Sequence, residues 1–282
     1  MLPNFLVIGA RKAGTTSVYH YLRAHPQIFM STTKELRYFI PEKNWSRGIG
    51  WYEHHFDHAN DARAIGEASP GYTRYPRSEG IPALIAQVLP DVRLIYLVRQ
   101  PVERMISHYL DNLRRLWESE LSPEKALLSD RRYIDESRYS MQIEQYLRHF
   151  GREQLLIVKT EDLIAPETIE GVFRFLGVDV FVPANLNERH GSTTERQRQQ
   201  RAVRPTASFL SKNFRRVPGY KRLLRRTPQS LKRVKQRIVA KEMESTIRIA
   251  PEVIRELETR LRPDVECLHE FMGRDFDGWG IG

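Results

Sequence analysis

Cysteine is almost absent from the chain, and so are long hydrophobic runs. Cys267 is the single cysteine among 282 residues, which excludes an internal disulfide and a zinc site with four cysteine ligands. No apolar run approaches the ~20 residues that cross a bilayer. The first residues also lack the basic region and the cleavage site of a secretory signal. These absences lead us to expect a soluble, cytoplasmic protein.

Acidic side chains are missing from one long segment. Residues 196–241 contain 16 Lys or Arg and no Asp or Glu. The whole chain carries a net charge of +10, so the remainder of the chain is acidic, at −6. We expect this basic segment, placed at about 190–245, to form short helices with a cationic outer face. The alternatives are that it binds an anionic acceptor or attaches peripherally to an anionic membrane surface.

Short apolar runs alternate with helical patterns along the chain. The predicted strands span residues 5–8, 93–98 and 155–158, and a C-terminal helix is predicted at about 250–272. Such alternation is typical of a parallel sheet with helices on both faces. We therefore expect an α/β protein with a P-loop-like parallel β-sheet, forming a single domain over residues 1–282.

A loop rich in glycine and hydroxyl residues follows the first predicted strand. Residues 9–17 read Gly-Ala-Arg-Lys-Ala-Gly-Thr-Thr-Ser and precede a helical pattern, so backbone N–H groups and a helix N-terminus should converge on one phosphate. A nucleotide triphosphatase loop has a lysine after its second glycine, but here Thr15 takes that position and Lys12 lies inside the loop. The pattern favours phosphate binding without ATP chemistry, and a Gly-rich turn without a ligand is the alternative.

This loop resembles the 5′-phosphosulfate-binding loop of sulfotransferases that use 3′-phosphoadenosine 5′-phosphosulfate (PAPS). The family's second element, a strand followed by Arg and a later Ser, is matched at residues 94–109, with Arg99 and Ser107 at its two ligand positions. The resemblance implies that these two residues bind the donor's 3′-phosphate through a guanidinium and a hydroxyl group. It also implies that the donor's 5′ side is bound by Arg11, Lys12, Ala13, Gly14, Thr15, Thr16 and Ser17.

Three further stretches resemble the branch of this family that contains the heparan sulfate sulfotransferases. They are residues 25–28 with 33–39, residues 50–52 with Phe56, and residues 67–72. Two positions depart from that branch: Ala68 stands where it has Lys, and Thr16 stands where it tends to have Arg. These departures argue against transferring a heparan substrate to this chain.

The resemblance also implies catalytic roles. Glu35 matches the catalytic base of that branch, and burial should raise its pKa towards the working pH. The alternative is a carboxylate that only pairs with Lys34 or Arg37. Cytosolic small-molecule sulfotransferases use a histidine instead, and His20, His25, His54, His55 and His108 are candidates that no motif favours. Lys12 is expected to stabilise the charge that develops on the bridging oxygen as adenosine 3′,5′-bisphosphate leaves. The sequence contains no metal-ligand cluster, so no metal ion is expected.

The acceptor is not identified by the sequence. The resemblance favours a hydroxyl on a carbohydrate, and a hydroxylated lipid, polyketide or other small metabolite is the alternative. Loops at 40–82 and 111–138 are expected to shape the acceptor cleft, with His54, His55 and Tyr72 as candidate contacts. A P-loop phosphotransferase would need the lysine missing after Gly14. A nucleic-acid-binding protein would leave the two phosphate elements unexplained, so no nucleic acid is expected as a partner.

Overall fold

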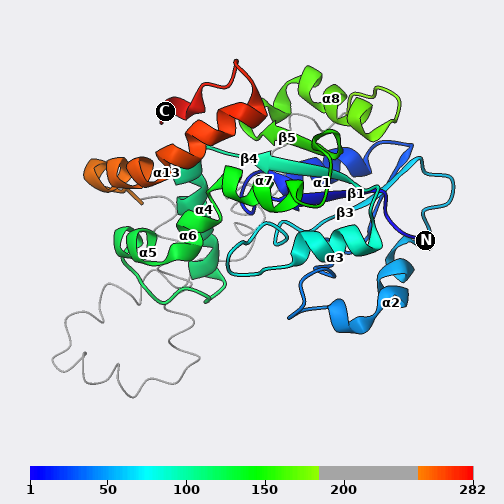
Figure 1. Ribbon diagram of the computed structural model, residues 1–282, viewed down its shortest axis with the longest axis horizontal. Coiled ribbons are helices and arrows are strands. Elements are labelled where there is room, and N and C mark those ends of the chain that lie inside the picture. The colour runs from blue at the N-terminus through cyan, green and yellow to red at the C-terminus, as the bar shows by residue number, and fades with distance from the viewer. Residues whose placement is uncertain (184–246, 282) are drawn as a thin grey trace, which may run out of the picture.

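Five parallel strands form the centre of the computed structural model, which describes residues 1–183 and 247–281 (Figure 1). Their order in the sheet is β2-β3-β1-β4-β5, and every neighbouring pair is parallel. The strands are β1 (Phe5–Gly9), β2 (Ile28–Met30), β3 (Ala64–Ala68), β4 (Arg93–Val98) and β5 (Leu155–Lys159). The predicted parallel α/β fold is confirmed, and the basic segment 196–241 lies outside the described residues.

β1, β4 and β5 are recognisable in the sequence because each contains an apolar run of at least four residues. Every residue of β1 is buried, and so are all residues of β4 after Arg93, as expected for inner strands of a parallel sheet. β2 has only three residues, and β3 reads Ala-Ile-Gly-Glu-Ala, so neither gives such a run. The interpretation of residues 40–82 as loop is wrong at β3, because its Gly and Glu interrupt the apolar pattern of a buried strand, and at Ile49–Glu53, which form a short helix.

Helices cover both faces of the sheet. The α-helices are α1 (Thr15–Arg23), α2 (Ile49–Glu53), α3 (Ile81–Val88), α4 (Pro101–Arg114), α5 (Pro123–Ser129), α6 (Arg131–Asp135), α7 (Tyr139–Leu147), α8 (Pro166–Leu176) and α13 (Pro251–Met272). The crossovers from β1 to β2 and from β3 to β4 run in opposite directions along the sheet. Right-handed connections therefore place α1 and α3 on opposite faces. Figure 1 shows α3 and α7 in front of the strands.

Short 3-10 helices occupy several connections. They are η1 (Trp45–Arg47), η2 (His54–Phe56), η3 (Arg152–Gln154), η4 (Glu161–Ile164) and η5 (Gly278–Gly280). The loop prediction for residues 111–138 is also wrong in part, because α5 and α6 lie within it. Both of these helices are short, and their apolar side chains pack against α4. Their sequences are therefore too short to show a clear helical pattern of apolar residues.

A second apolar cluster forms beyond β4, where α4, α5, α6 and α13 pack together (Figure 1). α13 contributes Leu257 and Leu261, which are fully buried. Further along α13, the Asp264 carboxylate accepts hydrogen bonds from the backbone N–H groups of Ser140 and Met141, at 3.1 and 2.9 Å. These bonds cap the N-terminus of α7 and join the C-terminal helix to the sheet domain. Within the described residues, no helix has the length and apolar character needed to cross a membrane.

Candidate active site

The loop between β1 and α1 is shaped by two glycines. Gly14 has a left-handed backbone, with φ of 81°, at the N-cap of α1. A Cβ atom at Gly9 would lie 2.0 Å from the Thr73 hydroxyl oxygen, so only glycine fits there. The loop is tied to the strands and to Thr160, whose hydroxyl donates to the Ala13 carbonyl at 2.8 Å. The first turn of α1 contains no acidic residue, which leaves its N-terminus suited to an anion.

The two predicted phosphate elements line one cavity of about 510 Å³. β1 and β4 are neighbours in the sheet, so the loop after β1 and the residues after β4 lie side by side. Most predicted donor residues line this larger cavity: Arg11, Lys12, Gly14, Thr15, Thr16, Ser17, Arg99 and Ser107. Ala13 does not, because it is buried and its N–H donates to the Ala10 carbonyl.

Arg99 lies just before α4, and Ser107 lies about two turns further along, inside that helix. The Arg99 guanidinium pairs with Glu103 at 2.7 Å, and both side chains are substantially exposed. An exposed ion pair of this kind contributes little stabilisation. A phosphate group can therefore replace Glu103 as the partner of the Arg99 guanidinium. Tyr139 donates a hydrogen bond to the Arg99 carbonyl at 2.7 Å, which holds the backbone at this point.

Asp111 is a site residue that the sequence analysis missed. It is buried on α4 one turn after Ser107, lines the larger cavity, and lies 3.6 Å from the Lys12 ammonium group. Burial acts to raise the pKa of Asp111, but the positive charges of Lys12 and Arg115 outweigh burial and lower it. Asp111 is therefore a carboxylate that orients Lys12 inside the cavity. Only its spacing from Ser107 on one helix face could have indicated it.

Glu35 lies in the loop after β2, with its backbone N–H bonded to the Ala68 carbonyl at 3.0 Å. Its carboxylate pairs with the Lys34 ammonium at 3.7 Å and with the Arg37 guanidinium. Burial acts to raise the pKa of Glu35, but the Arg37 hydrogen bond and the charge of Lys34 reverse that effect and lower it. The expectation that burial raises this pKa is wrong, because the two neighbouring cations outweigh desolvation. Glu35 is ionised, and its carboxylate is held by cations.

A buried cluster of hydroxyl groups around Glu67 holds the loop that contains Glu35. The Glu67 carboxylate on β3 accepts hydrogen bonds from the hydroxyls of Ser69 and Tyr72, both at 2.6 Å, and of Tyr52 at 3.3 Å. The Ser69 oxygen in turn accepts the Arg37 backbone N–H at 2.9 Å. Burial raises the pKa of Glu67, and the hydroxyl donors oppose that rise. Tyr72 is thus placed under the site, and it lines neither of the cavities beside Glu35.

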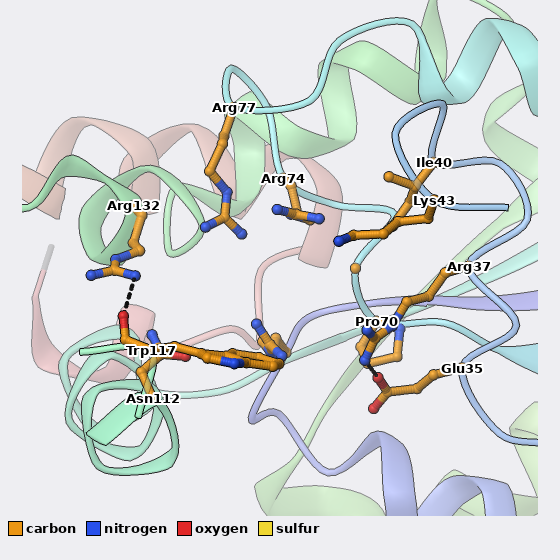
Figure 2. Close-up of a pocket in the computed structure, with 12 residues that line it drawn as sticks. Glu35, Arg37, Ile40, Lys43, Pro70, Arg74, Arg77, Asn112, Trp117 and Arg132 are labelled. Atoms are coloured by element: carbon orange, nitrogen blue, oxygen red, sulfur yellow. Dashed lines mark hydrogen bonds and ion pairs between the residues drawn. The ribbon is translucent and has the colours of Figure 1, made fainter. Parts of the chain in front are cut away.

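A smaller cavity of about 270 Å³ adjoins the larger one. The two share Arg11, Glu35 and Pro70 as lining residues. Figure 2 shows the charged ends of Lys43, Arg74 and Arg77 pointing towards the same space, with the ring of Trp117 across from them. Glu35 therefore lies where the two cavities meet, which is the position that a proton acceptor between two substrates requires.

His54 and His55 lie away from both cavities. They belong to η2, where the exposed His54 ring pairs with Asp57 at 2.6 Å and the His55 ring packs against Trp51. The geometry gives these two residues no contact with the site. A different histidine, His108, is fully buried on α4 and lies 3.5 Å from the Arg11 guanidinium. Burial lowers the pKa of His108 well below its usual value, and the charges of Arg104 and Arg11 add to this effect.

Residues 1–183 and 247–281 contain no group of three or more His, Cys, Asp or Glu side chains that could hold a metal ion. The charged groups of the site are arginines, lysines and isolated carboxylates. Such a set is suited to phosphate or sulfate groups.

The sequence profile of the sulfotransferase domain matches residues 2–216 of this chain. The chain belongs to the sulfotransferase family. Among relatives, the membrane-associated sulfotransferase kil1 of Dictyostelium discoideum is 42% identical over 111 residues, which cover 38% of this chain and 22% of that protein. Human heparan sulfate glucosamine 3-O-sulfotransferase 3B1 is 31% identical over 172 residues, 58% of this chain and 43% of that protein. This sulfotransferase chain spans less than half the length of both relatives.

Among solved structures, a sulfotransferase from Alicyclobacillus acidocaldarius superposes with a TM-score of 0.70. The match covers 99% of each chain at 23% sequence identity, and it shows that the two sulfotransferases share a fold. The match of the sulfotransferase domain profile confirms the family membership predicted from the two phosphate elements.

Proposed function

We propose that this sulfotransferase moves the sulfuryl group of PAPS to a hydroxyl group on a carbohydrate. The observation that carries the proposal is that both phosphate elements line one cavity, with Glu35 at its junction with a second cavity. The donor has two phosphate positions, and the larger cavity has two anion-binding ends. One end is the loop at the N-terminus of α1, and the other is Arg99 with Ser107.

The proposed step assigns a task to each side chain at the junction. The acceptor oxygen forms a bond to sulfur, and the bond between sulfur and the bridging phosphate oxygen breaks. Glu35 accepts the acceptor's hydroxyl proton. Lys12, oriented by Asp111, stabilises the negative charge that appears on the bridging oxygen of adenosine 3′,5′-bisphosphate.

The lining of the smaller cavity favours a polar acceptor. Its apolar contributions come from Ile40, Pro70 and Trp117, and its other side chains are charged or amide groups. Sites for lipids or other apolar metabolites are lined mainly by hydrophobic and aromatic side chains. An exposed tryptophan beside hydrogen-bonding groups is suited to a sugar ring, so a carbohydrate hydroxyl fits better than a hydroxylated lipid or polyketide.

Calorimetric titration with adenosine 3′,5′-bisphosphate tests the donor assignment. We expect binding by the wild type and about 10- to 100-fold weaker binding by Arg99→Ala, because a charged hydrogen bond to the 3′-phosphate is lost. ADP, which lacks that phosphate, should bind weakly to both proteins. Equal binding of ADP and the bisphosphate would refute the assignment of Arg99. Transfer of radioactive sulfate from PAPS to a panel of oligosaccharides then tests the acceptor class.

A further inference from the structure

The smaller cavity has a large excess of positive charge. Six cationic side chains line it: Arg11, Arg37, Lys43, Arg74, Arg77 and Arg132. Glu35 is the single carboxylate that lines it among the described residues. Such an excess strongly favours a ligand with negative charge in this space.

Several of these cations already have partners outside the cavity. Arg77 pairs with the buried Glu136 at 2.8 Å, and Arg132 pairs with Glu118 at the same distance. Lys43 and Arg74 form no ion pair within the described part of the chain. The Arg74 Nε atom is buried without a hydrogen-bond partner there. Lys43 and Arg74 therefore supply binding capacity that an acidic group of a ligand can satisfy.

Arg37 connects this cavity to the proton acceptor. It lines the cavity with Lys43 and Arg74, and its guanidinium also holds the Glu35 carboxylate. That contact opposes proton transfer, because it occupies an oxygen of the base and lowers the pKa of Glu35. The other cations that act on Glu35 are Lys34 on the same loop and Arg11 on the loop after β1.

We propose that an acidic group on the carbohydrate acceptor binds Lys43 and Arg74 and replaces Glu35 as the partner of Arg37, which frees the base only when that acceptor is bound. This inference rests on the proposed function and adds to it a charged acceptor and a reason for selectivity in turnover. A neutral sugar of the same shape would leave Arg37 on Glu35. The sulfuryl group would then meet an acceptor whose proton has no available base.

The test uses the full chain saturated with adenosine 3′,5′-bisphosphate and two matched probes. One probe is a heparosan hexasaccharide, whose glucuronate units carry carboxylates. The other is the same hexasaccharide after reduction of those carboxylates to neutral alcohols. Calorimetry measures the affinity of each probe, and carbon-13 NMR follows the titration of the Glu35 carboxyl, assigned by its loss in Glu35→Gln.

We expect the acidic probe to bind about tenfold or more tightly than the neutral one, and to raise the pKa of Glu35. In Arg37→Gln the pKa of Glu35 should already be raised before the probe is added, and the probe should add little. Arg74→Gln should weaken binding of the acidic probe without changing the pKa of Glu35 in the probe-free complex. Arg131→Gln is the matched control, because its side chain is 79% exposed and lines neither cavity.

Three results would overturn the proposal. Equal affinity for the two probes, or no binding of either, would remove the acidic acceptor. An unchanged pKa of Glu35 in the wild type with the acidic probe bound would remove the exchange of partners. An equal rise in the wild type and Arg37→Gln would mean that the probe acts on Glu35 by repulsion alone. None of these results touches the binding of adenosine 3′,5′-bisphosphate, which tests the proposed function separately.

Discussion

Replacing Glu67 by Gln tests whether the buried hydroxyl cluster holds the Glu35 loop in place. The Glu67 carboxylate accepts short hydrogen bonds from Ser69 and Tyr72, both at 2.6 Å, and it is fully buried. Glutamine keeps the shape of the side chain but converts one acceptor oxygen into an N–H donor, so one of these short contacts is lost. A lost charge-assisted hydrogen bond costs about 1.5–3 kcal/mol. We expect the free energy of unfolding to fall by about that amount.

Urea unfolding followed by tryptophan fluorescence measures this loss. Tyr72→Phe is the matched comparison, because it removes one donor without adding another, and its expected cost is about 1 kcal/mol. Glu67→Gln should also lower turnover, because the Ser69 oxygen that bonds Glu67 also accepts the Arg37 backbone N–H. Affinity for adenosine 3′,5′-bisphosphate should not change, since Glu67 does not line the larger cavity. Unchanged stability together with unchanged turnover would refute the reasoning.

Four further predictions follow from the same structure. Lys12→Ala should lower kcat about 100-fold or more while donor affinity changes less, because the charge on the leaving oxygen develops in the transition state; a loss confined to KM would contradict this role. Glu35→Gln should lower kcat by about 100-fold or more and remove the acidic limb of the pH–rate profile, and near-normal turnover would exclude it as the base. Gly9→Ala should lower the free energy of unfolding by about 1–3 kcal/mol, because its Cβ would collide with the Thr73 hydroxyl, as calorimetric melting can check. Burial raises the pKa of Asp264 from 3.8 to about 6 in the folded protein. The stability that the protonated side chain contributes is therefore complete below pH 3.8 and is lost as the pH rises through about 6. The free energy of unfolding of the wild type minus that of Asp264→Asn, measured by urea unfolding, should therefore differ by about 3 kcal/mol between low and neutral pH. A value of this difference that is independent of pH would argue against the raised pKa.

The cavity that both predicted phosphate elements line was predictable, because each element is a short continuous stretch of the sequence. The residues of the loop after β1 and the pair Arg99 and Ser107 follow two strongly apolar strands, and parallel neighbours bring the carboxyl ends of those strands together. The local sequence of such a motif is enough to predict the conformation of its backbone. Ala13 was assigned with its neighbours, but the structure buries it and places its N–H on another backbone group.

The residues that the sequence analysis missed depend on contacts between distant segments. Asp111 contacts Lys12 across 99 positions of the chain. The segment that contains Asp111 has the pattern of an ordinary amphipathic helix. Tyr72 was expected to contact the acceptor. The motif around it did not indicate that its hydroxyl donates a hydrogen bond to Glu67 instead. The strands β2 and β3 were missed because neither contains an apolar run long enough to be recognised.

The sequence by itself determined the fold class, the sulfotransferase family and the positions of the two elements that we propose bind the donor's phosphates, because apolar runs, glycine positions and helix starts are local properties of the chain. Only the tertiary structure decided the electrostatics of Glu35. Its pKa depends on which cations approach it, and these come from separate loops: Lys34 and Arg37 lie beside it in the chain, whereas Arg11 follows β1. The positive charge of the smaller cavity is likewise assembled from four separate segments, which hold Arg11, Arg37 with Lys43, Arg74 with Arg77, and Arg132. Coulombic interactions depend on distance in space, so no reading of spacing along the chain could have given this arrangement.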